Sequence, residues 1–101
     1  MRVITKAHLK RAGEEYPDAK TALQSWYQTM SCTQFNNFAE LKHVFGAVDR
    51  VGKVVVFNIK GNHYRLIAAI HYNTKLVYIL EVMTHVEYDK DKWKDKYRLY
   101  H

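Results

Sequence analysis

Cysteine is almost absent from this sequence of 101 residues, in which Cys32 is the single thiol. One thiol cannot form an internal disulfide or an all-cysteine zinc site, and this is typical of a reducing compartment, so we expect a cytoplasmic protein. The amino terminus lacks the apolar core of a signal peptide, and no apolar run approaches the roughly 20 residues that a membrane-spanning helix needs. The sequence therefore predicts a protein that is neither secreted nor embedded in a membrane.

Metal-binding and phosphate-cradling motifs are also missing. The six histidines include no pair at the i, i+4 spacing of a zincin-like helix. His63 and His71 lie about 26 Å apart along a strand, at about 3.3 Å per residue, which is too far to share one ion. The four glycines are scattered singly, and Cys32 has no base beside it for nucleophilic catalysis. We therefore expect no metal and no cofactor.

Positive charge is the main compositional feature. The formal net charge is +6, and the excess is spread along the chain. Such a balance favours an acidic partner, either nucleic acid or an acidic protein surface, although a merely soluble basic protein has the same composition. The length predicts one domain over residues 1–101.

Helices are predicted to come first. After a short edge strand over residues 1–4, Thr5 is the expected cap of a helix over residues 6–12, which Gly13 ends. Pro17 restarts the chain into a second helix, whose apolar residues recur at spacings of three and four. This stripe is expected to pack on a sheet and comprises Ala19, Ala22, Leu23, Trp26, Tyr27 and Met30.

A third, short helix is predicted from the capping-box spacing of Asn37 and Glu40, and it ends near residues 45–46. Its inward-facing residues are expected to be Phe38, Leu41, Val44 and Phe45. A short strand follows within residues 47–52.

Residues 53–58, 63–72 and 76–82 are predicted to form an antiparallel meander of three strands. A two-residue turn at residues 60–61 pairs Phe57 with Tyr64, whereas a turn at residues 61–62 shifts every partner. Both registers place Asn58 and Arg65 on the same face, because they differ by an even number. The face of Glu81 stays open at this stage, since turns of two and three residues near Asn73 place it on opposite sides.

The predicted fold class is α+β, with N-terminal helices packed on one face of a twisted antiparallel β-sheet and a short C-terminal helix. The other face is expected to be partly open and to carry Asn58, His63, Arg65 and His71. Thr84 and Glu87 have the spacing of a capping box for the C-terminal helix. On that helix the neighbouring positions are those of His85, Tyr88, Asp89 and Lys92.

This face suits phosphodiester cleavage without a metal, which requires groups that move protons and a group that stabilises charge on the phosphate. Arg65 is the best candidate for the phosphate, because a guanidinium on a strand grips two oxygens in fixed geometry. The alternative role of Arg65 is a surface salt bridge. His85 is the best candidate for proton transfer, with an exposed first-turn residue as the alternative. Asp89 either orients the imidazole or pairs with a neighbouring lysine.

Two motifs resemble the HigB toxins of bacterial type II toxin-antitoxin systems. They are VFNIKGNHYRLIA over residues 56–68 and EVMTHVEYD over residues 81–89. The opening residues 4–5 and 9–10, the Tyr16-Pro17 pair and the LKHVF run over residues 41–45 are similar to the same family. The likeness thus covers nearly the whole chain.

The resemblance implies a RelE-like fold and an mRNA interferase, a ribonuclease of ribosome-bound messages in which the ribose 2'-hydroxyl attacks the adjacent phosphate without a metal. It implies catalytic roles for Arg65, Glu81, His85, Tyr88 and Asp89. The side chains then expected to bind RNA are Lys53, Asn58, Lys60, Asn62, His63, His71, Lys90 and Lys92. Many RelE-like toxins carry a second arginine two residues after the first, where this strand has Ile67.

The partners implied by the resemblance are a HigA-type helix-turn-helix antitoxin, which represses the shared operon together with the toxin, and mRNA in the ribosomal A site. Two alternatives stay open. A RelE-like fold also carries the gyrase-poisoning ParE toxins, and a non-catalytic RNA- or protein-binding module would use Arg65 and the lysines for affinity alone.

Overall fold

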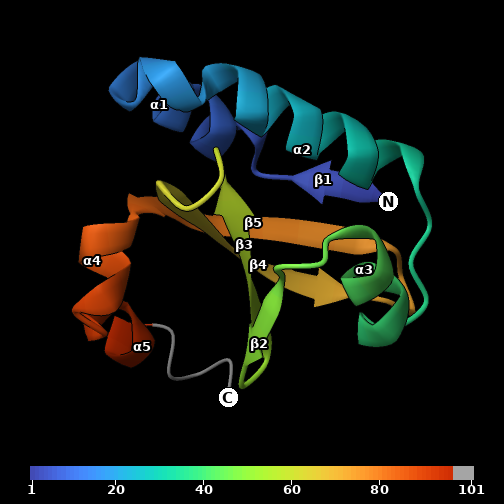
Figure 1. Cartoon of the computed structure of the whole chain (residues 1–101). Helices are drawn as coiled ribbons and strands as arrows, with labels where there is room; N and C mark the ends of the chain where they lie inside the picture. The colour runs from blue at the N-terminus through green and yellow to red at the C-terminus, as the bar shows by residue number, and fades with distance from the viewer. Residues whose placement is uncertain (97–101) are drawn as a thin grey trace.

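The computed structural model describes residues 1–96, with side chains to residue 94, as a five-stranded sheet with helices on both faces (Figure 1). In chain order the elements are β1 (Arg2–Ile4), α1 (Lys6–Glu15), the 3-10 helix η1 (Pro17–Ala19), α2 (Lys20–Cys32), α3 (Phe38–Val44), β2 (Asp49–Val51), β3 (Val54–Ile59), β4 (Tyr64–His71), β5 (Leu76–Thr84), α4 (His85–Asp89) and α5 (Lys92–Lys96). No helix in this part of the chain is long and apolar enough to cross a bilayer.

The sheet is mixed, with strand order β1-β5-β4-β3-β2. Strands β2 to β5 form the predicted antiparallel meander with one more strand at its edge. The expectation of a wholly antiparallel sheet is wrong at the other edge, where β1 runs parallel to β5. Because β1 reaches the sheet without a hairpin, no turn motif in the sequence sets its direction.

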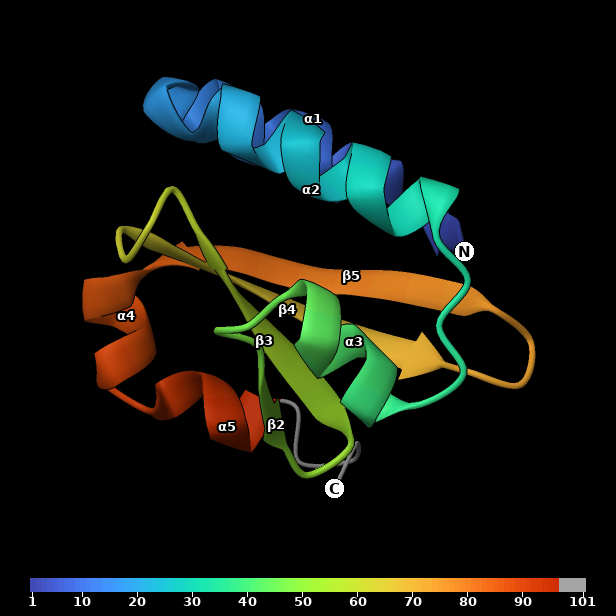
Figure 2. The same cartoon turned by 45° about the vertical axis from the view of Figure 1, so that its right-hand side comes forward.

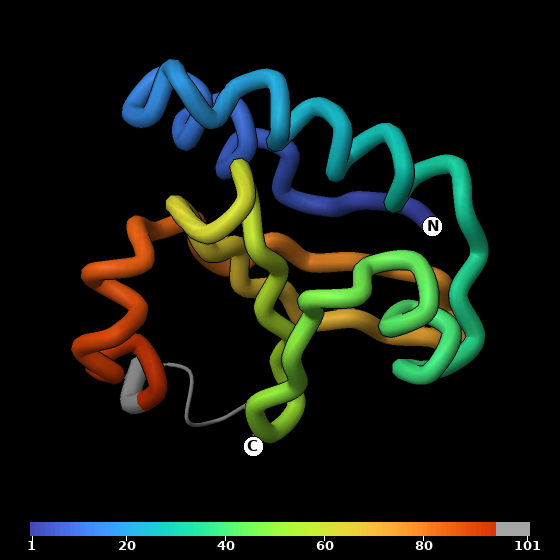
Figure 3. Tube along the Cα trace, viewed as in Figure 1, coloured from blue at the N-terminus to red at the C-terminus, as the bar shows by residue number. Residues whose placement is uncertain are grey.

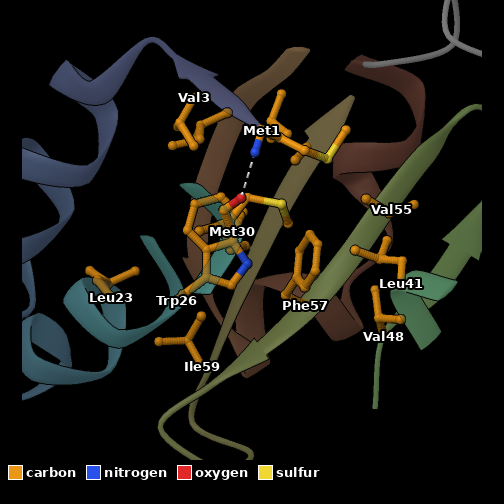
Figure 4. Close-up of a cluster of buried hydrophobic side chains, with 14 of the residues drawn as sticks. Met1, Val3, Leu23, Trp26, Met30, Leu41, Val48, Val55, Phe57 and Ile59 are labelled. Carbon is orange, nitrogen blue, oxygen red and sulfur yellow. Dashed lines mark hydrogen bonds between the residues drawn. The ribbon is translucent and has the colours of Figure 1, made fainter. Parts of the chain in front are cut away.

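Helices α1, α2 and α3 cover one face of the sheet, as predicted (Figure 2). The expected stripe of α2 lies against this face, with Trp26 edge-on to Phe57 at 5.3 Å between ring centroids (Figure 4). Also in this core, the Met1 amino group donates a hydrogen bond to the Met30 carbonyl at 3.1 Å. In α3, Leu41 is buried as expected, but Val44 is 48% exposed and the prediction for it is wrong. Val44 is the last residue of α3.

The first helix begins at Lys6 as predicted, but its predicted cap and its predicted end are wrong. Thr5 does not cap α1, because its hydroxyl bonds the backbone N–H and carbonyl of Ile79 on β5 instead. Gly13 lies within the helix, which continues to Glu15. A helical glycine costs only about 1 kcal/mol relative to alanine, so it does not by itself end a helix. The end falls before Pro17, whose ring disfavours helical geometry in the residue preceding it.

The turn between β3 and β4 uses the second of the two registers considered, with Phe57 opposite Leu66 and Asn58 opposite Arg65. The register that pairs Phe57 with Tyr64 is therefore wrong, and the shared face of Asn58 and Arg65 is confirmed. On the other side of β4, Glu81 lies opposite Ile67, with a β-bulge between this pair and the next. Next to this bulge, Glu81 lines a pocket with His8, Arg11 and Glu15.

The second face of the sheet is partly covered by α4 and α5. Trp93 of α5 closes a small core with Val54, Val56, Ile67 and Met83. The predicted single C-terminal helix is two helices, since Asp91 adopts a left-handed backbone with φ of 60°. The expected grouping of Lys92 with His85 on one helix is therefore wrong, because Lys92 begins α5.

Candidate active site

Arg65 occupies the edge of the second core, at the end of β4 nearest the β3–β4 turn. Its Nη2 donates to Asn62 Oδ1 at 2.5 Å, and its Nη1 donates to the carbonyl oxygens of Asn62 and Tyr64 at 3.2 Å and 3.1 Å. A guanidinium has five N–H groups. In the described part of the chain, the Nε–H and one Nη2–H have no protein acceptor, so a partly buried, tethered cation still has donors for an anion.

Tyr88 of α4 supports this guanidinium from one side. The Arg65 Cζ atom lies 5.4 Å from the centroid of the Tyr88 ring, within the range of a cation–π contact. The Tyr88 ring is stacked on Trp93, with centroids 5.0 Å apart and planes 17° apart. Burial raises the pKa of the Tyr88 phenol, so the phenol stays protonated at neutral pH.

His85 and Asp89 form a pair one helical turn apart on α4. The His85 Nδ1 atom lies 3.4 Å from Asp89 Oδ2, and the two side chains are 47% and 66% exposed. Two kinds of partner were considered for Asp89, the His85 imidazole and a neighbouring lysine. In the structure Asp89 contacts the imidazole. With Nδ1 beside the carboxylate, Nε2 is the ring nitrogen that is left for other contacts.

The start of α4 and the β3–β4 turn lie side by side (Figure 3). The His85 N–H donates to the His63 carbonyl at 3.0 Å, and the Thr84 side chain accepts from the Glu87 N–H, as the predicted cap requires. The turn that holds Arg65 is thus joined to the helix that carries His85. Asn62 is part of this arrangement as a ligand of Arg65, and Asn58 lies exposed across from Arg65.

Lys60, which is predicted to bind RNA, also has a contact within the fold. Its ammonium forms an ion pair with Asp18 of η1 at 2.9 Å, and the Tyr64 hydroxyl donates to the same carboxylate at 2.6 Å. The Tyr64 hydrogen bond, and after it that of Lys60, holds the pKa of Asp18 below its ordinary value. Sequence reasoning missed Asp18 as a support of the turn, because 46 residues separate it from Tyr64 and no local motif links them.

Tyr16 completes this support on the helical side. Its ring lies 4.8 Å from that of Tyr64, and burial together with the charges of Glu87 and Glu15 raises the pKa of the Tyr16 phenol to about 12. Glu87, predicted as a cap of α4, also interacts with Tyr16 at the end of α1.

Several predicted RNA contacts lie away from Arg65. His71 is at the far end of β4, about 20 Å along the strand, with its ring 5.3 Å from that of Tyr78. Lys53 is in the turn at the other end of β3 from Asn58. Lys90 and Lys92 are exposed at the junction of α4 and α5, and His63 is exposed in the β3–β4 turn. Among residues 1–96 no cluster of three potential metal ligands occurs.

N-terminal helices cover one face of the sheet, Arg65 lies on β4 and His85 lies on α4. This combination of fold and site is that of a RelE-like toxin. Residues 19–91 match the family of HigB toxins, described as the RelE-like toxic component of a toxin-antitoxin system. The chain belongs to this HigB toxin family, which confirms the resemblance and the predicted fold. Membership implies an antitoxin partner.

Curated relatives extend the match over most of the chain. The mRNA interferase toxin HigB of Escherichia coli strain K12 is 40% identical over 92 residues, which cover 88% of each chain. The mRNA interferase HigB of Shigella flexneri shows the same identity and coverage. The mRNA interferase HigB of Escherichia coli O6:H1 is 31% identical over 93 residues, or 89% of this chain and 90% of that one.

Proposed function

We propose that this toxin is an mRNA interferase, a metal-independent endoribonuclease that cleaves messages in the ribosomal A site and so inhibits translation. The observation that carries the proposal is the Arg65 guanidinium, which is tethered by three hydrogen bonds and keeps two N–H groups for a phosphate. The turn that tethers it is bonded to the helix of the His85 and Asp89 pair. Relatives 40% identical to the chain are named mRNA interferases.

The proposed reaction is an in-line attack of the ribose 2'-hydroxyl on the adjacent phosphorus. The bond from phosphorus to the 5' oxygen breaks, and the products are a 2',3'-cyclic phosphate and a free 5'-hydroxyl. Arg65 donates to the non-bridging oxygens, on which negative charge develops. One proton leaves the 2'-hydroxyl and one reaches the 5' oxygen, and His85 transfers a proton in this exchange. Glu81, which lies opposite Ile67 in the sheet, is the further carboxylate of the proposed reaction.

We also propose a HigA-type helix-turn-helix antitoxin as the cytoplasmic partner that neutralises this toxin. The family supports an antitoxin as such, and its helix-turn-helix class follows from the resemblance alone. Copurification of the toxin with the product of the adjacent gene tests this pairing. An antitoxin without a helix-turn-helix domain would contradict it.

Primer extension on a defined message in a purified translation reaction tests the activity. We expect new 5' ends only when ribosomes and the wild-type toxin are both present. Arg65→Ala should lower the cleavage rate about 10²-fold to 10³-fold, as loss of a charge-stabilising donor does. His85→Ala should lower it about 10²-fold or more.

Arg50→Ala is the matched control. Arg50 also lies on a strand with its guanidinium 5.4 Å from an aromatic ring, that of Phe38, but it is on the opposite face of the sheet. We expect this variant to cleave as the wild type does. Full cleavage by a folded His85→Ala variant would refute the role of the histidine.

Other outcomes separate the alternative functions. If no new ends appear and translation is undisturbed, the interferase proposal is wrong. An SOS response without message cleavage would indicate gyrase poisoning of the ParE type. Salt-dependent RNA binding without cleavage would indicate a non-catalytic binding module.

A further inference from the structure

The contacts of Arg65 continue beyond the residues that would touch a substrate. Its guanidinium lies 5.4 Å from the Tyr88 ring, and that ring is stacked on the Trp93 indole at 5.0 Å. Trp93 is 5% exposed and packs in the second core with Val54, Val56, Ile67 and Met83. We call Asn62, Arg65, Tyr88 and Trp93 the arginine column, which joins the candidate active site to a buried anchor.

Each contact in the arginine column restrains a different motion. The oxygens of Asn62 accept from the edge of the guanidinium, so they limit its rotation within its own plane. The Tyr88 ring limits tilting of that plane. Trp93 restrains Tyr88 twice, by ring stacking and by a hydrogen bond of 3.0 Å from Nε1 to the Tyr88 carbonyl oxygen.

A left-handed residue between α4 and α5 places Trp93 against the Tyr88 ring. Trp93 follows Tyr88 by five residues, which on an unbroken α-helix would place it about 140° around the axis. The left-handed backbone of Asp91, with φ of 60°, separates α4 from α5 and returns the indole to the Tyr88 ring. A non-glycine residue in this conformation is uncommon, so the turn is held by the contacts that follow it.

We propose that Trp93 is a positioning residue, which fixes Tyr88 against Arg65 and thereby holds the guanidinium in the orientation that contacts the phosphate. This proposal rests on the role of Arg65 proposed above. Without the indole, Tyr88 can change rotamer and Arg65 loses its support, although neither residue has been altered. Positioning of this kind matters because displacement of a catalytic group by about 1 Å can lower a rate about 10²-fold.

The first test needs no catalysis, and it uses NMR of the arginine guanidinium groups in the free toxin. A ring contact and three hydrogen bonds should give Arg65 a ring-current shift and slow rotation of its Nη groups, with the signal assigned by its absence in Arg65→Lys. Trp93→Met keeps an apolar side chain in the core but removes the ring and the N–H donor. We expect it to abolish both properties of Arg65, and Trp93→Phe to preserve the shift.

Arg50, at 5.4 Å from Phe38, is the internal control, and its signal should not change in either Trp93 variant. The proposal is wrong if the Arg65 signal is unchanged in Trp93→Met, or if it changes only together with that of Arg50. Should Trp93→Met fail to fold, Trp93→Leu makes the same test, because Tyr88 is kept while the indole ring and its N–H donor are removed, with the same expected loss at Arg65.

The second test measures ribosome-dependent cleavage at a temperature at which all variants are folded. Trp93→Met should lower kcat about tenfold with KM within about twofold, because the contact with the transition state is lost while the groups that bind the message remain. Trp93→Phe should recover most of the rate, and Phe38→Met should not change it. A Trp93→Met variant that is less stable but has the wild-type kcat would show a purely structural role and overturn the proposal. A wild-type toxin that cleaves no message would refute the proposed function, while the NMR result would still decide whether Trp93 holds Arg65.

Discussion

Asp18 stabilises the turn that holds Arg65, although it makes no contact with Arg65 itself. It lies in η1, and its carboxylate binds the Tyr64 hydroxyl and the Lys60 ammonium on either side of the β3–β4 turn. That turn carries Asn62, which in turn holds Arg65. Lys60, which is also predicted to bind RNA, is thus joined to η1 through this carboxylate.

The Asp18 pairing predicts a pH dependence of stability. The folded-state pKa of Asp18 lies below its ordinary value of 3.8, so the unfolded chain binds the proton more tightly than the folded chain does. The stabilisation is therefore fully present above the unfolded pKa and is lost as the pH falls through the folded pKa. Asp18→Asn should lower the free energy of unfolding at neutral pH, and the difference from the wild type should shrink below about pH 4. Urea unfolding over this pH range measures it, and a difference that does not change with pH would contradict the pairing.

Among the elements, α4 is short and depends on its first turn. It has five residues, and Thr84 provides the capping oxygen for the Glu87 N–H at 3.2 Å. Helices of this length are not stable by propensity alone. The cap and the contacts of Tyr88 therefore place His85 relative to the β3–β4 turn.

Removal of this cap should destabilise the helix. We expect Thr84→Ala to lower the free energy of unfolding by about 1 kcal/mol and to speed amide hydrogen exchange in α4. Thr84→Ser keeps the oxygen and should remain within about 0.3 kcal/mol of the wild type. Equal exchange rates in the alanine variant and the wild type would show that the cap does not hold α4.

Strand β4 explains why a second arginine is missing two residues after Arg65. Ile67 is fully buried at 0% exposure between Val56 and Glu81 in the sheet, and it packs with Trp93. The position serves the second core here, so the phosphate contacts of the proposed site rest on Arg65.

Substitution of Ile67 tests whether this position serves the apolar core or can hold a second arginine for the phosphate. Ile67→Arg buries a charge in an apolar core and should lower the free energy of unfolding by about 3 kcal/mol or more. Ile67→Val, which removes one methylene group, should cost about 1 kcal/mol. Thermal unfolding of both variants makes the comparison, and a stable arginine variant with faster cleavage would contradict the burial argument.

At the scale of the whole molecule, the net charge of +6 should govern encounter with RNA. If about three phosphates are neutralised, affinity for a short single-stranded RNA should fall roughly tenfold to twentyfold between about 50 and 200 mM salt. Arg65→Ala should lower the slope of log K against log salt by about 0.7. Lys10→Gln, on α1 across the sheet from Arg65, should leave the slope unchanged. Fluorescence anisotropy measures these slopes, and equal slopes for Arg65→Ala and the wild type would exclude a phosphate contact.

Much of this architecture follows from local patterns. The apolar stripe of α2, the caps at Asn37 and Thr84 and the alternation along β4 each depend on residues within a few positions of one another. The shared face of Asn58 and Arg65 was predictable for the same reason, since it depends on parity alone. Together with the family motifs, these patterns identify a RelE-like toxin.

The sequence by itself determined most elements of this protein, their order and the residue types of the proposed site, because propensity, capping and alternation act over short stretches of chain. Tertiary structure alone decided which side chains meet. It paired Lys60 with Asp18, set β1 parallel to β5 and placed Trp93 against Tyr88 beside Arg65. Such contacts join distant segments or depend on one unusual backbone angle, so their free energy appears only when the whole sheet is packed.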